Sequence, residues 1–580
     1  MGLWAAGGKK ARPLSRYVES VSAAEQMENP SGEQSVTDKP PSSSDAREPD
    51  EQARSPWLRT LALALLVALA LLGEERGVEH IAAWGSHVSA AALELLHGSA
   101  AAAAAADVSA FAREASARAD AAVDKISAQL RLSRDHVSRG TVSLGDNAPF
   151  YRLLERAANI RRRGAGHITV LAFGGSSTTG ADLDRLDEIF AAVFGRALGD
   201  VLGVPVVVLN AAVGGTGSDY YAVCASQHLS SNVDVVLTEN AVNDGITLVG
   251  DKLEPTAIMQ QLILSVQALA PHAALVYAGL LGPSCRTGED IPGILAVYKL
   301  YNISIVSTRN LIYGPPSLWG DPAACPELQA PFVMEDMFKG KRHAGSKPHA
   351  YLALLILNVL KEQFRVAAAV PTSVARRFRL PLLDALPYAG RPFDCKSTLS
   401  PRFGAPLVPV PTPGCEAVWT ASGEPELVGS GCNGLEASQL WGDSVSETPL
   451  SSEVEDFPLV ENWELSSASF FAPDKPDSVR QDHKFNWDAQ GAGAPITFLI
   501  LIGGVGTVAV GYLKGDEFYG AATFRISNAA GVEHSAEISD DIKGVRHTHA
   551  AILFRDLEAG WWRLRVEPHA RFGLCAIATM

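Results

Sequence analysis

The chain has 580 residues, too many for one ordinary core, so two folded domains with connecting segments are expected. Its formal net charge of −15, from 49 Lys and Arg against 64 Asp and Glu, argues against sequence-independent nucleic-acid binding. The seven cysteines form no CxxC pair, and no HExxH or Cys/His ligand spacing occurs, so the sequence indicates no metal site. All seven cysteines follow residue 200, which suits a reducing compartment for the N-terminal third and an oxidising one for the rest.

The N-terminal segments are expected to lie outside the folded domains. Residues 1–56 are rich in Ser, Pro, Glu and Gln and cannot bury enough apolar surface to fold alone, so we predict a disordered tail. Residues 57–73, WLRTLALALLVALALLG, are uncharged after Arg59 and predict a membrane anchor, although a bilayer span usually needs ~20 residues. A soluble core helix and a cleaved signal peptide are the alternatives.

The charges around this apolar run predict its orientation. Arginines precede the run, whereas Glu74 and Glu75 follow it, and the positive-inside rule then favours a cytosolic N-terminus. The remainder would be lumenal, in agreement with the positions of the cysteines and of the sequon Asn302-Ile303-Ser304. The sequence therefore predicts a single-pass type II membrane protein of the secretory pathway, in the Golgi or ER lumen or at the cell surface.

Residues 74–140 are expected to form an Ala-rich helical stem, because this stretch has high helix propensity and few large apolar residues. It lacks a sustained heptad of large apolar residues, so the sequence does not predict a coiled-coil dimer. The oligomeric state stays open.

Residues 141–366 show the alternation of strands and helices that is typical of an α/β domain. Continuous Val, Leu and Ile runs are typical of parallel strands covered on both faces, which predicts a three-layer, flavodoxin-like sheet. In such folds ligands bind beyond the carboxyl ends of the strands. The main expected elements are strands at 167–175, 204–210, 233–240 and 273–280 and helices at 186–202 and 254–270.

The C-terminal part of the chain has a different sequence pattern. Residues 367–455 are rich in Pro, Gly and Ser and are expected to be a connector, whereas 456–580 predict a β-sandwich of short, regularly spaced strands. An Asp/His cluster at 540–549, DDIKGVRHTH, is interpreted as a polar hairpin loop rather than a second site. The expected strands are 495–502, 506–513, 521–527, 549–557 and 561–569.

The first strand of the α/β domain ends in Gly174-Gly175-Ser176-Ser177-Thr178-Thr179-Gly180. A serine on a tight strand-to-helix turn can project its hydroxyl into a cleft while neighbouring N–H groups point at a developing oxyanion. The alternatives are a helix cap or a phosphate-binding loop. The phosphate loop is disfavoured, because the segment has neither the Lys of GxxxxGK[ST] nor a GxGxxG motif.

Three further strand ends and loops carry residues that could complete such a site. Gly215 could present its N–H to the same oxyanion, or be the left-handed residue of a turn. Asn243 could donate a side-chain N–H, or cap an Asn-Asp turn. His343, in a loop before a helix that starts near Ser346, could serve as general base, whereas the first-turn His349 is the weaker candidate and more typical of packing or capping.

These blocks, in this order, resemble those of the SGNH (GDSL-type) hydrolase superfamily, and within it the membrane-anchored eukaryotic and capsule-associated branch with a C-terminal β domain. The resemblance covers about residues 150–365 by motif and the tail from 460 by looser pattern. It implies that Ser176 is the nucleophile, that Gly215 and Asn243 form an oxyanion hole and that His343 is the base. It implies neither a cofactor nor a metal.

The sequence departs from the family pattern in two places. Gly175 stands where the first block normally has Asp, and Gly340 stands where the last block has the Asp that orients the imidazole. We expect Asp336, or failing it Glu335, to reach His343. Otherwise the site would work as a Ser-His dyad or be impaired, because oxyanion and base contributions survive separately.

The chemistry that the resemblance implies is acyl transfer through an acyl-serine. Water as acceptor would make the protein an esterase, with an O-acetylated glycan as the expected substrate, and a sugar hydroxyl as acceptor would make it an O-acyltransferase. The non-enzymatic alternative is a lumenal glycan-binding or scaffold protein with a degraded site.

Overall fold

The computed structural model describes residues 106–580 with internal gaps. The gaps are 249–253, 284, 286, 320–324, 329, 340–342, 370–391, 398–408, 411–414, 421, 423, 431–462, 469–483, 490–491, 494, 515–519 and 539–546. The predicted tail at 1–56, the predicted anchor at 57–73 and most of the connector lie outside the described residues. Within the described part, no helix is long and apolar enough to cross a membrane.

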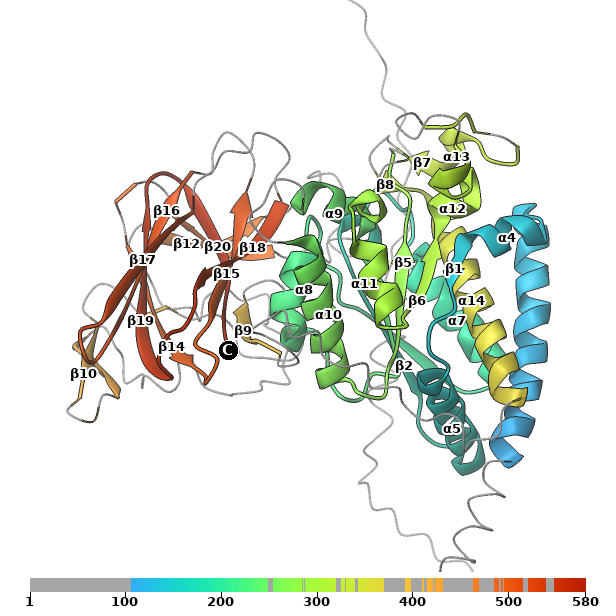
Figure 1. Ribbon diagram of the computed structural model, residues 1–580, viewed down its shortest axis with the longest axis horizontal. Helices are drawn as coiled ribbons and strands as arrows, with labels where there is room; N and C mark the ends of the chain where they lie inside the picture. The colour runs from blue at the N-terminus through green and yellow to red at the C-terminus, as the bar shows by residue number, and fades with distance from the viewer. Residues whose placement is uncertain are drawn as a thin grey trace, which may run out of the picture. The chain divides into compact units, whose positions relative to one another are not determined.

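A six-stranded sheet forms the centre of the α/β domain, in the order β1-β6-β5-β4-β2-β3 (Figure 1). Strands β2 to β6 are parallel to their neighbours, and β1 pairs antiparallel with β6. The parallel strands therefore run 2-1-3-4-5 in chain order, which is the flavodoxin-like arrangement, and the predicted fold class is confirmed. The strands are β1 Thr141–Ser143, β2 Ile168–Gly174, β3 Val206–Asn210, β4 Val235–Glu239, β5 Ala274–Gly279 and β6 Ser304–Ser307.

Helices cover both faces of this sheet, because alternate residues of the buried strands point to opposite sides and both sets are apolar. One core lies against α5, α7 and α14, and the other against α8, α10 and α11. The helices are α5 Ala148–Arg163, α7 Phe190–Leu202, α8 Ser218–Cys224, α10 Pro255–Leu269, α11 Ile294–Leu300 and α14 Ser346–Ala369. Shorter helices are α4 Arg134–Gly140, α6 Ser176–Thr179, α9 Ala241–Thr247, α12 Thr308–Tyr313 and α13 Met334–Met337.

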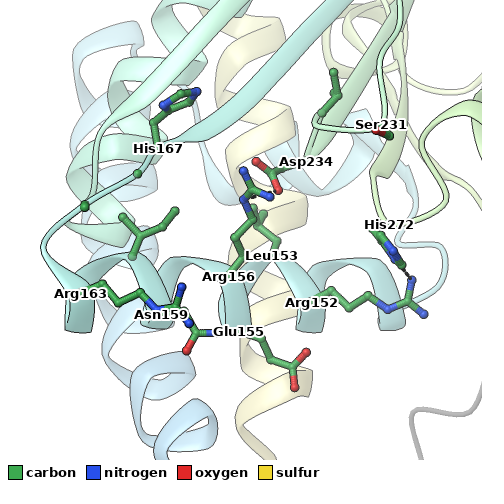
Figure 2. Close-up of a pocket in the computed structure, with 14 residues that line it drawn as sticks. Arg152, Leu153, Glu155, Arg156, Asn159, Arg163, His167, Ser231, Asp234 and His272 are labelled. Carbon is green, nitrogen blue, oxygen red and sulfur yellow. Dashed lines mark hydrogen bonds and ion pairs between the residues drawn. The ribbon is translucent and has the colours of Figure 1, made fainter. Parts of the chain in front are cut away.

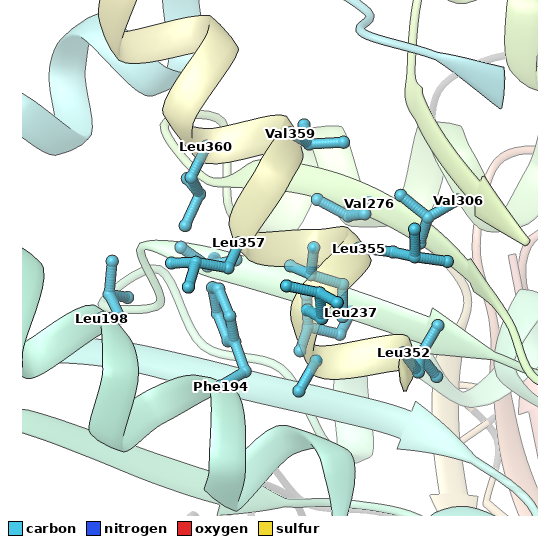
Figure 3. Close-up of a cluster of buried hydrophobic side chains, with 14 of the residues drawn as sticks. Phe194, Leu198, Leu237, Val276, Val306, Leu352, Leu355, Leu357, Val359 and Leu360 are labelled. Carbon is cyan, nitrogen blue, oxygen red and sulfur yellow. The ribbon is translucent and has the colours of Figure 1, made fainter. Parts of the chain in front are cut away.

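The helix α14 supplies much of the first core, since nearly all of its apolar residues are buried. Figure 3 shows Leu355 of α14 toward Val306 of β6, and Phe194 of α7 toward Leu357 of α14, all in one buried cluster. Burying side chains of this size contributes about 1.5–3 kcal/mol each before the entropy of ordering is subtracted. This packing fixes the start of α14, and with it the loop that carries His343.

Part of the segment expected as a stem packs on the α/β domain. A helix covers residues 106–130, and its face of Phe111, Ala112 and Ala115 is buried in the same core as α14. The small alanine side chains allow close approach, and Ser116 Oγ donates to the Lys361 carbonyl of α14 at 3.4 Å. The described part of this Ala-rich segment thus belongs to the folded unit.

The described strands of the C-terminal region are antiparallel, and two of their sheets share one core, as the sandwich interpretation predicts. One sheet has the order β12-β13-β20-β15-β18, with β9 also paired to β20, and the other has the order β14-β19-β16-β17. A separate two-stranded sheet pairs β10 Glu416–Trp419 with β11 Pro425–Val428. The strands are β9 Asp394–Ser397, β12 Trp463–Ala468, β13 Lys484–Ala489, β14 Ile496–Ile502, β15 Val508–Lys514, β16 Ala522–Asn528, β17 Glu533–Ile538, β18 His547–Phe554, β19 Gly560–Pro568 and β20 Phe572–Thr579.

Disulfide bonds connect segments far apart in the sequence. Cys224 at the end of α8 is bonded to Cys395 of β9, so the first sheet of the C-terminal domain is covalently linked to the α/β domain. Cys285 is bonded to Cys325, and Cys415 is also disulfide-bonded.

Candidate active site

The turn after β2 leaves the first of its hydroxyl residues partly exposed and uses its two threonines for structure. Gly175 is the N-cap of the short helix α6 and makes no side-chain cap, so the Ser/Thr cluster is not a capping motif. Thr178 Oγ1 donates to Glu239 Oε2 at 2.6 Å, and Thr179 Oγ1 donates to the Ser176 carbonyl at 2.8 Å. Ser176 is partly exposed, whereas the three residues after it are buried.

The structure brings His343 to this serine. His343 Nε2 lies 3.0 Å from Ser176 Oγ, and His343 Nδ1 lies 2.8 Å from Asp182 Oδ2. The histidine is held by the short strand β8, His343–Ala344, which pairs with β7, Phe338–Lys339. A carboxylate on one ring nitrogen and a hydroxyl on the other is the geometry in which imidazole can take the serine proton.

The carboxylate beside His343 is a correction to the sequence interpretation. Asp336 was expected there, but it forms an ion pair with Lys347, and Asp182 occupies the Nδ1 side of the ring. Asp336 lies on α13 and is exposed, so the loop does not fold it back onto the imidazole. The Gly340 position lies outside the described residues.

The sequence pattern does not predict Asp182, because the family's orienting acid comes just before the histidine. It lies six residues after the serine, in a turn where Gly180 has φ 89° and Asp182 itself has φ 64°. Asp is one of the few side chains that tolerate the left-handed region, and backbone strain of this kind clusters at functional sites. The available signal was the closeness of GADLD to the nucleophile turn, where an acid could reach the same histidine.

Asn243 lies directly against the nucleophile turn. A side chain at Gly175 would collide with it, since a Cβ there would lie 1.8 Å from Asn243 Nδ2. Asn243 is buried, and its Nδ2 donates to the Thr216 carbonyl at 2.6 Å, which leaves the second amide hydrogen for another acceptor. The replacement of the family's Asp by Gly175 therefore makes room for the amide.

Gly215 lies in the loop between β3 and α8, as the sequence placed it. Its φ of 66° is in the left-handed region, which glycine adopts without strain. Its carbonyl accepts from the Thr548 N–H at 2.8 Å, and the next residue, Thr216, is the one held by Asn243. The Thr216 carbonyl also lies near Gly175, since a Cβ at Gly175 would lie 3.2 Å from it, so the loop borders the nucleophile turn.

His349 is a core residue, in line with its weaker standing in the sequence. It is fully buried and stacks on Phe190, whose N–H donates to His349 Nδ1 at 3.2 Å. Burial lowers its pKa to about 3, so the ring is neutral at physiological pH.

Two buried carboxyl groups accept hydrogen bonds from the turns that form the site. Glu239, at the end of β4, accepts from Thr178 of the nucleophile turn, and burial raises its pKa to about 8. Asp244 accepts from the Ser218 N–H at 2.7 Å and from Ser218 Oγ at 2.8 Å, and burial raises its pKa to about 7. Both groups hold turns of the site, and neither contacts Ser176 or His343 in the described network.

A separate hollow lies at the other end of the sheet, among residues that precede the strands (Figure 2). Arg156 Nε contacts Asp234 Oδ1 at 2.9 Å there, and Arg152 contacts His272. Asp234 Oδ2 also accepts from the Thr169 N–H at 2.8 Å, so this carboxylate connects α5 with the amino end of β2. The residues at the carboxyl ends of the strands are the ones that carry the nucleophile arrangement.

Comparison with known proteins gives structural likeness only. No family model matches the sequence, and no curated protein matches it. A two-domain esterase (CEX) active on acetylated mannans aligns over 76% of this chain and 97% of its own, with 13% identity and a TM-score of 0.46. TesA aligns over 34% of this chain and 99% of its own, with 19% identity and a TM-score of 0.23. The esterase EstA from Pseudoalteromonas sp. aligns over 33% of this chain and 97% of its own, with 16% identity and a TM-score of 0.23. Identities and scores this low assign no activity to the chain.

Among the described residues, no group of three or more His, Cys, Asp and Glu side chains is placed to hold a metal ion.

The triad geometry predicts how three variants of the full chain should react. Ser176→Ala should abolish labelling by a fluorophosphonate probe, and His343→Ala and Asp182→Asn should each lower kcat/KM on p-nitrophenyl acetate at least about 100-fold. The physical reason is loss of the nucleophile, of the base, and of the group that orients the base. Asp336→Asn is the matched control and should stay near wild type. An Asp336→Asn loss as large as that of Asp182→Asn would contradict the arrangement.

The raised pKa of Glu239 predicts a pH dependence of stability. The folded state binds this proton more tightly than the unfolded state, so the contribution is present below the ordinary pKa of 4.5 and is lost as pH rises through about 8. Glu239→Gln keeps an acceptor for Thr178 but cannot titrate. Urea unfolding at pH 5 and pH 8 should therefore show a smaller fall in unfolding free energy for Glu239→Gln than for wild type. Glu335→Gln, at an exposed position, is the control, and equal falls in all three proteins would refute the assignment.

Proposed function

We propose that this protein is a serine esterase of the SGNH (GDSL-type) hydrolase superfamily that removes ester groups, foremost O-acetyl groups, from a glycan. The observation that carries the proposal is the continuous contact from Asp182 through His343 to Ser176, at 2.8 and 3.0 Å. The order of the motif blocks and the flavodoxin-like sheet support the same assignment. The glycan substrate follows from the family resemblance of the blocks and from the β domain attached to them.

The proposed reaction starts with the serine. His343 Nε2 takes the proton of Ser176 Oγ as the oxygen attacks the ester carbonyl carbon, and the negative charge develops on the carbonyl oxygen. The N–H groups of Ser176 and Gly215 and the free amide hydrogen of Asn243 would stabilise that oxyanion. Collapse of the tetrahedral species breaks the bond between the carbonyl carbon and the sugar oxygen. The sugar oxygen then takes from His343 the proton that came from Ser176.

The second half of the reaction releases the acyl group. Water loses a proton to His343 and attacks the acyl-serine carbonyl, so acetate leaves and Ser176 recovers its proton. A sugar hydroxyl in place of water would transfer the acetyl group instead. The esterase is proposed because Ser176 is partly exposed and so accessible to water.

The degraded-site alternative rested on a missing acid. Asp182 supplies a carboxylate at the ring nitrogen where the family places one, although it comes from a different part of the chain. The base contact and the buried amide of Asn243 are also in place. These observations favour an enzyme over a scaffold.

The proposed activity predicts release of acetate from acetylated glycans. Acetylated mannan, the substrate of the two-domain esterase mentioned above, is a suitable first polymer, followed by acetylated xylan and a de-esterified control. The full chain should release acetate at a rate that Ser176→Ala lowers to background. Loss of acetyl groups without free acetate, together with new acetyl groups on an added sugar, would show a transferase. No reaction with any ester by a folded wild type would refute the proposal.

We also propose that the chain is a type II membrane protein of the secretory pathway, in the membrane-anchored branch of the superfamily. The apolar run at 57–73 and the charges that flank it support an anchor with the N-terminus in the cytosol. The disulfides Cys224–Cys395 and Cys285–Cys325 support a lumenal position for the rest. Asn302 of the sequon is exposed, in the turn before β6.

The topology predicts the result of protease protection on sealed microsomes that contain the full chain. External protease should remove only the tail before residue 57, and a glycosidase-sensitive mobility shift should disappear in Asn302→Gln. Complete digestion of the region after residue 73 before the membranes are opened would contradict the proposed orientation.

A further inference from the structure

The strand β18 lies at the end of its sheet order, so one of its edges faces away from β15. An unpaired edge exposes N–H and C=O groups that need partners when they are buried. Here two N–H groups on that edge are bonded to the α/β domain. The Thr548 N–H donates to the Gly215 carbonyl at 2.8 Å, and the Ala550 N–H donates to Asp219 Oδ2 at 2.9 Å.

One acceptor is Gly215 itself, the proposed oxyanion donor, and the other is on the helix that follows its loop. Asp219 lies one residue into α8, directly after this loop, and its side chain is 2% exposed. Thr216, between the two, forms a parallel bridge with Thr548. The edge of β18 therefore runs alongside residues 215–219 and bonds them at both ends.

The same loop is also held by α9, the helix that follows β4. Asn243 Nδ2 donates to the Thr216 carbonyl, and Asp244 accepts two hydrogen bonds from Ser218. The loop and the start of α8 are thus hydrogen-bonded to two elements, α9 and β18. Their contacts with α9 are internal to the α/β domain, whereas those with β18 come from the C-terminal domain.

We propose that the edge of β18 contributes to the active site by holding Gly215 in position to bind the oxyanion. The Thr548 N–H does so directly, and Asp219 acts as a positioning residue through the Ala550 N–H. This inference rests on the proposed esterase function. It gives the C-terminal domain a role in the chemical step, because its strand sets the position of a loop that contacts the reacting atoms.

The physical basis is the sensitivity of oxyanion stabilisation to position. Gly215 is held in the left-handed region by a hydrogen bond on its own carbonyl, and a glycine without that bond can sample other conformations at little cost. A donor displaced by about 1 Å can cost of order 100-fold in rate. Removal of the Asp219 acceptor also leaves the buried Ala550 N–H unsatisfied, which favours a shift of the strand away from the loop.

An effect of this kind has a kinetic signature. The oxyanion exists only in the tetrahedral species, so a misplaced donor lowers kcat and kcat/KM together and leaves KM nearly unchanged. A role in stability alone would instead lower the melting temperature and leave kcat of the folded fraction unchanged.

The test uses three variants of the full chain with p-nitrophenyl acetate turnover and fluorophosphonate labelling as readouts. Asp219→Ala should lower kcat and the labelling rate about 10-fold or more, with KM within two-fold of wild type. Asp219→Asn, which keeps a side-chain carbonyl for the Ala550 N–H, should recover most of that loss. The matched control is Asp234→Ala, which removes a buried carboxylate that accepts a backbone N–H at the other end of the sheet. It should lower the melting temperature and leave kcat unchanged.

A backbone variant tests the other hydrogen bond and remains decisive if Asp219→Ala does not fold. Thr548→Pro removes the N–H that points to Gly215, at an edge position where proline is tolerated in a sheet. It should lower kcat in the same way, and Thr548→Ala, which keeps the N–H, should retain clearly more activity. Folded Thr548→Pro and Asp219 variants with kcat within two-fold of wild type would overturn the positioning role alone. A folded wild type with neither turnover nor labelling would overturn the proposed function and this inference with it.

Discussion

The parallel register of β2 with both β3 and β4 is the constraint on which the rest of the site depends. It brings the carboxyl ends of three strands to one edge of the sheet. The chain continues from β2 to β3 on one side and then crosses to β4 on the other side of β2, so this edge is the switch point of the fold. The nucleophile turn, the Gly215 loop and Asn243 follow those three strands in that order. Because β2 and β4 are buried on both faces, neither can slip by one residue without turning its apolar side chains away from the core that each now contacts.

Close packing then decides which residues can occupy the edge. Gly175 has no side chain because the Asn243 amide occupies that space, and Asn243 in turn reaches the loop that begins after β3. The same loop is bonded to β18 of the C-terminal domain, and the disulfide Cys224–Cys395 joins the two domains at the far end of α8. The β domain is therefore continuous with the site, and this differs from an accessory module tethered by a free linker.

Periodicity was sufficient to predict the doubly covered parallel sheet and the all-β C-terminal part. The resemblance of the motif blocks pointed to Ser176 and His343, which are in contact, and to Asn243, which lies against the nucleophile turn. The orienting acid was not predictable in the same way. Asp182 and Asp336 are both aspartates within a few residues of a motif, so the sequence alone does not separate them. The backbone conformation of the turn after Ser176, with φ 64° at Asp182, is what brings Asp182 to the imidazole of His343. The contact of Thr548 with Gly215 joins residues more than 300 positions apart, and no local pattern encodes such a pairing.

The most direct test of the central claim is detection of the covalent intermediate. The full chain would be mixed with p-nitrophenyl acetate, quenched in acid during turnover and digested, and its peptides analysed by mass spectrometry. The account predicts an acetyl group on Ser176 that disappears after the ester is exhausted. Turnover with the acetyl group on another residue, or with no acylated peptide while Ser176→Ala remains active, would contradict it.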